Sequence, residues 1–241
     1  TSVATPLDNH LLAVLPPAAQ STFFSELERV EMPLGMVLYE PGISLLHAYF
    51  PVDCIIALQY VMENGASSEM AMVGPEGVVG LALITGGKNT SSRAIVQNSG
   101  SAYRLRASKF QEEFHRHKEM LELMLLYTQA LLTQISQISA CNCHHHIDQQ
   151  LSFWLLMCLD RLPGNCIYLT HELIAAMLGV RREGITDAAG KLQKLGVIEY
   201  SRGHITVLDR PALEKLSCEC YAVVRKESDR LLPWAKSATK I

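Results

Sequence analysis

The first half of the chain alternates short apolar runs with turn-forming residues, a pattern typical of an all-β domain. From Val30 to about Arg106, turn signals recur about every eight to twelve residues. In the last apolar run Tyr103 and Leu105 fall on one face and two arginines on the other, and residues 68–73 alternate in the same way. We therefore expect an antiparallel, jelly-roll-like β-roll. Its expected strands are residues 36–40, 46–51, 53–63, 69–74, 93–97 and 102–106.

The middle of the chain changes to a helical period. Between Lys118 and about Cys141 there is neither Gly nor Pro, and apolar residues recur at helical spacing. One row of side chains is spaced 3, 4, 3, 4, 3, as in the seam of a two-stranded coiled coil. The row consists of Leu121, Met124, Thr128, Leu131, Ile135 and Ile138. We expect a dimerisation helix over residues 118–142, and the alternative is a helix that packs on its own β-domain.

The last third predicts a winged helix-turn-helix. A helical run stops at Pro163-Gly164, Thr170 is a suitable N-cap for a second helix, and Gly179 separates this helix from a third. Two short strands follow and complete the wing. The predicted fold class is therefore α+β, with a β-roll, a long dimerisation helix and a winged helix-turn-helix. The expected domains are residues 1–117, 118–142, 143–215 and a C-terminal helical tail at 216–241.

The segment 171–190 meets the packing demands of a helix-turn-helix. Ala175 is small where two helices cross, and Gly179 falls at the turn four residues later. The residues expected in the shared core are Ile174, Leu178, Val180, Ile185 and Ala188. Those expected to point outward from a recognition helix at about 181–195 are Arg181, Arg182, Glu183, Thr186 and Asp187. Such a helix enters the major groove of DNA.

The outward side chains have the chemistry of base recognition. Arg182 can donate to both O6 and N7 of guanine, Glu183 can accept from N4 of cytosine, and Thr186 can contact a thymine methyl group. Asp187 completes the predicted base-contacting set. The residues expected to contact phosphates are Thr170, Arg181, Lys191, Lys194, Arg202 and His204. The alternatives are a solvated helix face, or a winged helix that binds protein instead of DNA.

Composition excludes several classes of protein. The chain has 241 residues, of which 49% are hydrophobic and 19% charged, so it is neither a disordered tail nor a small disulfide scaffold. No run approaches the roughly 20 apolar residues of a membrane span, and residues 1–10 lack the pattern of a signal peptide, so we expect a soluble, cytoplasmic protein without a membrane partner. Seven cysteines, an odd number, are expected to be thiols in a reducing compartment.

Charge is unevenly distributed along the chain. Residues 1–143 carry 8 basic and 13 acidic residues, a balance of −5, whereas residues 144–241 carry 13 and 11, a balance of +2. A small positive balance permits an anionic partner such as double-stranded DNA without requiring one. Catalytic motifs are absent: the sequence contains no HExxH, and GGKNTSS lacks the spacing of a phosphate-binding loop. We therefore do not expect an enzyme.

Two segments resemble the CRP/FNR family of bacterial transcription regulators. LGMVLYEPG (34–42) resembles the start of the family's β-roll, and LTHELIAAMLGVRREGITDAAGKLQKLGVI (169–198) resembles its winged helix. The resemblance covers about residues 7–215 and implies a homodimer that binds an inverted repeat and that acts on RNA polymerase. It matches Arg182 and Glu183 to the family's base-contacting pair. Asp187 stands where cyclic-AMP-responsive members carry a second arginine, which implies a different half-site.

The resemblance leaves the effector of the β-roll unknown. In family members that bind cyclic nucleotides, a Gly-Glu pair contacts the ribose and an Arg-Ser pair the phosphate. Here Gly80 is retained but Leu81 replaces the glutamate, and the second pair is inverted to Ser92-Arg93, so a cyclic nucleotide is not favoured, although Arg93 could reach an anion from a shifted register. No cysteine precedes Cys54 to bind an iron-sulfur cluster, and no spacing supports a haem ligand such as His47. We expect no cofactor.

A dense group of thiol and imidazole side chains lies at the expected hinge between the long helix and the winged helix. It comprises Cys141, Cys143, His144, His145 and His146. Such ligands suit zinc or another soft metal, and Cys141 and His145 would share a helix face. A metal- or redox-responsive regulator is therefore an alternative function. The simpler interpretation is a polar hinge with no metal ligand, and a second thiol pair, Cys218 and Cys220, is expected in a structural helix.

Overall fold

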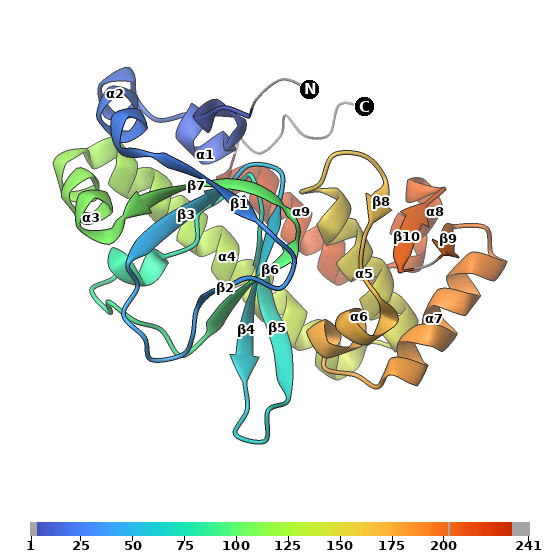
Figure 1. Ribbon diagram of the computed structural model, residues 1–241. Coiled ribbons are helices and arrows are strands. Elements are labelled where there is room, and N and C mark those ends of the chain that lie inside the picture. The colour runs from blue at the N-terminus through green and yellow to red at the C-terminus, as the bar shows by residue number, and fades with distance from the viewer. Residues whose placement is uncertain (1–3, 202, 233–241) are drawn as a thin grey trace.

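The computed structural model describes residues 4–201 and 203–232. Figure 1 shows a β-domain on one side and a helical, winged domain on the other, with α4 running behind both. This arrangement confirms the α+β fold class. The N-terminal domain contains η1 (Pro6–Asp8), α1 (His10–Ala13), α2 (Pro17–Glu26), β1 (Glu28–Met32), β2 (Val37–Tyr39), β3 (His47–Pro51), β4 (Ile55–Val61), β5 (Ser67–Val73), η2 (Leu81–Leu83), β6 (Arg93–Asn98), β7 (Gly100–Arg106) and α3 (Ala107–Arg116).

The β-domain is made of two antiparallel sheets, with strand orders β1-β7-β3 and β2-β6-β4-β5. Tyr103 and Leu105 of β7 are buried while Arg104 and Arg106 face outward, which confirms the predicted alternation. Strand β1 and the helices before it were not predicted from the apolar pattern. The sequence of β1, ERVEM, buries only Met32, because its other side chains lie at the edge of a three-stranded sheet.

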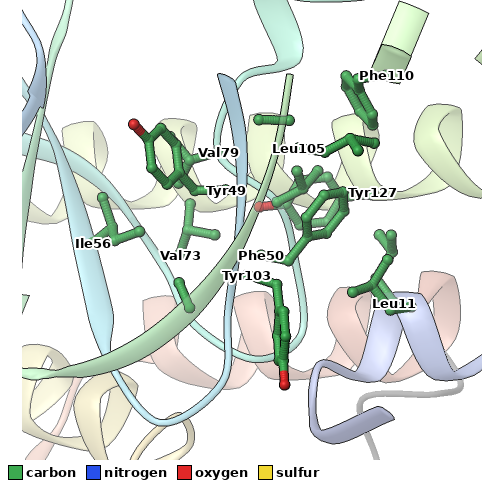
Figure 2. Close-up of a cluster of buried hydrophobic side chains, with 14 of the residues drawn as sticks. Leu11, Tyr49, Phe50, Ile56, Val73, Val79, Tyr103, Leu105, Phe110 and Tyr127 are labelled. Carbon is green, nitrogen blue, oxygen red and sulfur yellow. The ribbon is translucent and has the colours of Figure 1, made fainter. Parts of the chain in front are cut away.

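Aromatic rings fill the centre of the β-domain (Figure 2). Phe50 of β3 packs edge-on against Phe110 of α3 and Phe23 of α2, with ring centroids 5.9 and 6.4 Å apart. Edge-to-face pairs of this kind add about 0.5–1.5 kcal/mol each beyond the burial of area. These ring contacts therefore stabilise the packing of α2 and α3 against the sheet.

The long helix α4 (Lys118–His144) packs against the β-domain with one face. Met124 and Leu131, which the predicted dimer seam contains, are 1% and 9% exposed and lie in the core of their own chain. They are therefore not available to a partner, and that part of the predicted seam is wrong. The large apolar residues that α4 leaves exposed are Leu121, Leu125, Leu126 and Leu132. The apolar pattern could not separate the buried face of α4 from its exposed face, because both faces carry apolar residues at helical spacing.

The C-terminal domain is a winged helix-turn-helix followed by two further helices. Its three-stranded sheet has the order β8-β10-β9. Strand β8 was not predicted, because two residues are too short to show a period. Its elements are α5 (Ile147–Leu159), β8 (Cys166–Ile167), α6 (His171–Leu178), α7 (Arg182–Lys194), β9 (Ile198–Ser201), β10 (His204–Val207), α8 (Arg210–Leu216) and α9 (Glu219–Leu231). In the described ranges, no helix combines the length and apolar character that a membrane span needs.

The winged domain is docked on the outer face of the four-stranded sheet. Ile55, Ala57 and Met72 of this sheet belong to the same apolar cluster as Trp154 of α5 and Met177 of α6. An ion pair closes one side of the interface, where Nε of Arg161 lies 2.7 Å from Oε1 of Glu76, with side chains only 8% and 15% exposed. The two domains are therefore joined by a continuous buried interface and not only by the connecting chain.

A β-bulge in β5 places a carboxyl group in this interface. Leu58 pairs with Ala71 and Gln59 with Glu69, so Met70 has no opposite residue. The extra residue shifts the alternation by one, and Glu69 lies on the side of Met72 instead of continuing the Ala71 side. Regular alternation along 68–73 was therefore a wrong expectation. Burial raises the pKa of Glu69 to about 8, against smaller opposing effects of Trp154 and the positive charge of Arg161.

We predict that Glu69→Gln stabilises the fold in a pH-dependent way. Because the folded-state pKa of Glu69 exceeds the unfolded value of 4.5, wild-type stability falls as pH rises from about 4.5 to about 8. The neutral amide of the variant does not titrate, so the variant does not lose stability over this pH range. Each unit of pKa shift corresponds to about 1.4 kcal/mol in the free energy of unfolding. The variant should therefore gain a few kcal/mol over wild type near pH 8 and little near about pH 5.

Urea titrations of both proteins at the two pH values measure this difference. Glu63→Gln, an exposed glutamate near the tip of the β4–β5 hairpin, is the matched control and should behave like wild type. A pH-independent difference between Glu69→Gln and wild type would contradict the assignment.

Candidate nucleic-acid interface

Capping residues fix where the two helices of the helix-turn-helix begin and end. The hydroxyl of Thr170 accepts a hydrogen bond from the N–H of Leu173 and caps α6. Gly179 ends α6 with φ +66°, the left-handed conformation that glycine adopts without strain. Arg181 then occupies the N-cap position of α7. Thr170 and Gly179 thus have the backbone roles predicted for them.

Close packing fixes the angle of the recognition helix. A Cβ atom on Gly184 would lie 2.7 Å from Cδ1 of Ile147, so glycine allows α7 to approach α5. Ala175 is 4% exposed and lies in the shared core, as predicted. The need for a small residue at Gly184 was missed, because the contacting residue is 37 positions away in the sequence.

The first two turns of α7 present polar side chains to solvent. Those that the structure leaves exposed are Arg181, Arg182, Glu183, Thr186 and Asp187. The opposite face of α7 buries Ile185, Ala188, Ala189 and Leu192. The free backbone N–H groups of a helix N-terminus also favour an anion such as phosphate. The end of α7 that carries the predicted base-contacting residues is therefore accessible and electrostatically suited to DNA.

Thr186 is held by two hydrogen bonds within the domain. Its Oγ1 donates to the carbonyl oxygen of Arg182 at 3.1 Å and lies 3.2 Å from Nδ1 of His171. The hydroxyl is thus engaged, whereas the role predicted for Thr186 uses only its methyl group. These bonds restrict the rotamer of a residue at the centre of the exposed face.

A stacked pair of rings joins the helix-turn-helix to the wing. The rings of His171 and Tyr200 lie 3.9 Å apart with an interplanar angle of 23°. Burial, and then the positive charge of Arg182, lower the pKa of His171, which favours the neutral imidazole. This pair was not predicted from the sequence, because β9 and α6 are brought together only by the fold. Its effect is to fix the wing beside the N-terminus of α6.

The residues predicted to contact phosphates surround the recognition helix. Lys191 and Lys194 are exposed in the last turn of α7. His204, half-buried on β10, has its ring centroid 5.8 Å from that of Tyr168, which is 68% exposed and was not predicted. Arg202 lies outside the described residues. The described residues of this set thus lie at the N-caps of α6 and α7, in the last turn of α7 and on the wing strand β10.

The helix-turn-helix also contacts the β-domain of its own chain. Nε2 of Gln59 on β4 donates a hydrogen bond to Sδ of Met177 on α6 at 2.9 Å. A Cβ on Gly179 would stand 3.4 Å from Cβ of Ser68 on β5. The turn that precedes the recognition helix is therefore positioned by the β4–β5 hairpin, as well as by α5.

The predicted effector residues are engaged with protein groups. Nε of Arg93 donates to Oε2 of Glu40 at 2.8 Å, so its charge is already compensated. Ser92 is buried and its hydroxyl lies 3.0 Å from that of Thr90. Gly80 has φ +122°, and a Cβ there would stand 3.2 Å from Cα of Ala48. The backbone turn against β3 therefore explains Gly80 without a ligand.

Leu81 begins η2 and packs against the core of the β-domain. An aliphatic side chain at this position offers no hydrogen bond to a ribose. The four predicted effector residues thus make structural contacts, and Arg93 would have to leave Glu40 to bind an anion.

The structure rearranges the predicted thiol and imidazole group. Cys141 and His145 lie together with Cys218 and Cys220, whereas Cys143 is exposed. His144 and His146 are not in this group of four. A hydrogen bond from the Cys141 thiol lowers the pKa of Cys218. The two thiol pairs that sequence analysis treated separately therefore form one cluster, at the junction of α4 and α9.

Comparison with known proteins agrees with the geometry of this interface. Residues 149–216 match the family model of the Crp-like helix-turn-helix domain. The chain is 24% identical over 210 residues to the global nitrogen regulator of Synechococcus elongatus, covering 80% of this chain and 95% of that one. It is 26% identical over 189 residues to the global nitrogen regulator of Synechocystis, covering 74% and 83%.

Solved structures show the same fold. FixK2 from Bradyrhizobium japonicum superposes with a TM-score of 0.68 at 16% identity, covering 80% of this chain and 98% of that one. A CRP/FNR-family regulator from Eubacterium rectale superposes with a TM-score of 0.66 at 17% identity, covering 86% and 96%. The winged domain that carries the exposed N-terminus of α7 is thus similar to the Crp-like helix-turn-helix domain, and the whole chain shares its fold with regulators of the CRP/FNR family.

Proposed function

We propose that this chain acts as a homodimer that recognises an inverted-repeat operator, with one recognition helix α7 in each half-site. The observation that carries the proposal is the exposure of Arg182 and Glu183 in the first turn of α7, beside a helix N-terminus that attracts phosphate. Arg182 is assigned to guanine and Glu183 to cytosine. In this proposal the protein acts in the cytoplasm and regulates RNA polymerase at the promoters it binds.

Dimerisation is assigned to the exposed face of α4. Leu125 and Leu132, seven residues apart, are 61% and 59% exposed, and Leu121 is 38% exposed one turn earlier. A seven-residue repeat keeps one apolar row facing a partner helix. A two-fold arrangement of such helices would hold the two α7 helices about one duplex turn, ~34 Å, apart.

Regulation is assigned to the interface between the two domains. Gln59 of β4 contacts α6, and the ion pair of Glu76 with Arg161, just after α5, holds the rest of the winged domain. A signal that moves the β4–β5 hairpin or the loop around Glu76 would therefore change the position of α7. Because Arg93 is paired with Glu40, we assign no cyclic nucleotide to this role.

We predict that the purified chain selects an inverted repeat from a pool of randomised duplexes, and that Arg182→Ala relaxes this selection. Loss of a bidentate contact to guanine should reduce discrimination at one base pair of each half-site by about 1–3 kcal/mol, roughly 5- to 150-fold. Lys191→Ala is the matched control, because loss of a phosphate contact should weaken binding to specific and random duplexes alike. Sequencing of the selected pools and competition binding measure both quantities. Unchanged preference in Arg182→Ala would show that this arginine does not contact a base.

We predict that Leu125→Lys shifts the chain from dimer to monomer, because two lysines would meet in an apolar seam. Sedimentation equilibrium should show at least a tenfold increase in the dimer dissociation constant, which corresponds to about 1.4 kcal/mol. Leu208→Lys, at a leucine that is 57% exposed outside α4, should leave the constant unchanged. Equal behaviour of the two variants would place the dimer interface elsewhere.

A further inference from the structure

Four metal-ligating side chains meet where α4 ends and α9 begins. The ligand atoms of Cys141, His145, Cys218 and Cys220 all lie within 4.8 Å of one another. Sγ of Cys141 lies 3.5 Å from Sγ of Cys218, and Nδ1 of His145 lies 3.7 Å from Sγ of Cys220. Zn–S bonds of about 2.3 Å and Zn–N bonds of about 2.0 Å give tetrahedral edges of about 3.5–3.8 Å. The two measured edges thus have the size of a zinc tetrahedron.

The helices supply these residues in two pairs. Cys141 lies in the last turn of α4, and His145 is the C-cap residue, whose backbone N–H donates a hydrogen bond to the carbonyl oxygen of Cys141 at 3.0 Å. Cys218 is the N-cap of α9, and Cys220 lies in its first turn. The pairs are more than 70 residues apart in the sequence, with Cys141 and Cys218 separated by 77 positions. Their convergence therefore depends on the packing of α9 beside α4.

The donor set and its burial favour a closed site for a soft divalent cation. All three thiols are buried, and the side chain of His145 is 16% exposed. Structural zinc sites are tetrahedral, are made of cysteine and histidine, and leave no coordination position open to solvent. Metal binding displaces the thiol protons, and the resulting thiolates would repel one another in a buried place unless a cation lay between them. A divalent ion compensates that charge.

We propose that Cys141, His145, Cys218 and Cys220 bind one zinc ion, which joins the C-terminus of α4 to the N-terminus of α9. The ion would be coordinated by three sulfur atoms and by Nδ1 of His145.

The orientation of His145 supports this assignment independently. Its Nδ1 faces the thiols, while its Nε2 lies 3.2 Å from Oε2 of Glu219. A histidine that binds a metal commonly donates its other N–H to a carboxylate, which fixes the ring and its tautomer. The C-terminal end of α4 also carries the negative end of the helix dipole, which favours a cation. His145 is thus held as a metal ligand requires.

The neighbouring residues provide natural controls. Cys143 is exposed, and neither it nor His144 belongs to the cluster. Both nevertheless lie within two residues of a proposed ligand on the same helix. A metal held loosely by the local density of thiols and imidazoles would depend on these residues as well. A metal held by the four convergent side chains would not.

The site has a mechanical consequence for the fold. The α4–α9 junction lies directly before α5, whose first residue Ile147 contacts the recognition helix at Gly184. Bound zinc would fasten α9 to α4 at the point where the chain turns into the winged domain. Removal of the ion should therefore lower the melting temperature of the whole chain. The existence of the site does not depend on DNA binding.

The test is zinc content in the full chain purified under reducing conditions and dialysed against a weak chelator. Elemental analysis should find about one zinc ion per chain in wild type, Cys143→Ser and His144→Gln. The ion should be lost, by at least tenfold, in Cys141→Ser, Cys218→Ser and His145→Gln. Zinc below about a tenth of an ion per wild-type chain, or equal loss in Cys143→Ser, would overturn the proposal.

A second measurement uses the wild-type chain and does not depend on the folding of variants. Zinc is removed with a strong chelator, and cobalt(II) is added under argon with reductant. Tetrahedral coordination by thiolates should give intense visible absorption and a sulfur-to-cobalt band in the near ultraviolet, which one equivalent of zinc abolishes. Weak octahedral absorption would overturn the site. So would a disulfide between Cys141 and Cys218, found by mass spectrometry in the chain extracted without reductant in the presence of an alkylating agent.

Discussion

The arrangement of this protein depends on the packing of its winged domain against the outer face of the β2-β6-β4-β5 sheet. Helices α5 and α6 cover that face and shield it from solvent. Ile55 and Met72 of the sheet therefore belong to the same core as Trp154. The interface is closed by the pair of Arg161 and Glu76, with Nε and Oε1 2.7 Å apart and both groups largely buried. Removing one partner of such a pair leaves an uncompensated buried charge, at a cost of about 3–5 kcal/mol. The two halves therefore form one mechanical unit.

The loop that carries Glu76 connects this interface to the long helix. A Cβ on Gly77 would clash with the hydroxyl of Tyr127 on α4, and a Cβ on Gly74 would lie 2.8 Å from Cβ of Arg161. Both glycines permit close approach, one toward α4 and one toward the winged domain. A short segment of the β-domain therefore contacts both α4 and the winged domain. Displacement of this loop changes both contacts at once.

The recognition surface combines accessibility with a restricted conformation. Arg182 and Glu183 are exposed, but the helix that carries them is held by Gly184 against Ile147 and by the stacked rings of His171 and Tyr200. Contacts on a rigid element lose less conformational entropy on binding than contacts on a mobile loop. The position of α7 is thus decided by packing, while Arg182 and Glu183 stay accessible to solvent.

The amino-acid sequence by itself determined the order and type of most elements. Periods of two and of 3.6 are local properties, and so are the cap at Thr170 and the turn at Gly179, which is why the β-roll, the long helix and the helix-turn-helix could be predicted. The outward position of Arg182 and Glu183 follows from the same helical period. These features need no knowledge of distant residues.

Tertiary structure decided which apolar face of α4 is buried, where Glu69 points, and which cysteines meet. Met124 lies in the core and Leu125 in solvent, although both are apolar, because the β-domain covers only one side of the helix. A single bulged residue moved Glu69 into the domain interface. Cys141 meets Cys218 and not Cys143, because packing of α9 on α4 overrides proximity in sequence. Each of these outcomes depends on contacts between distant segments, which a local pattern does not encode.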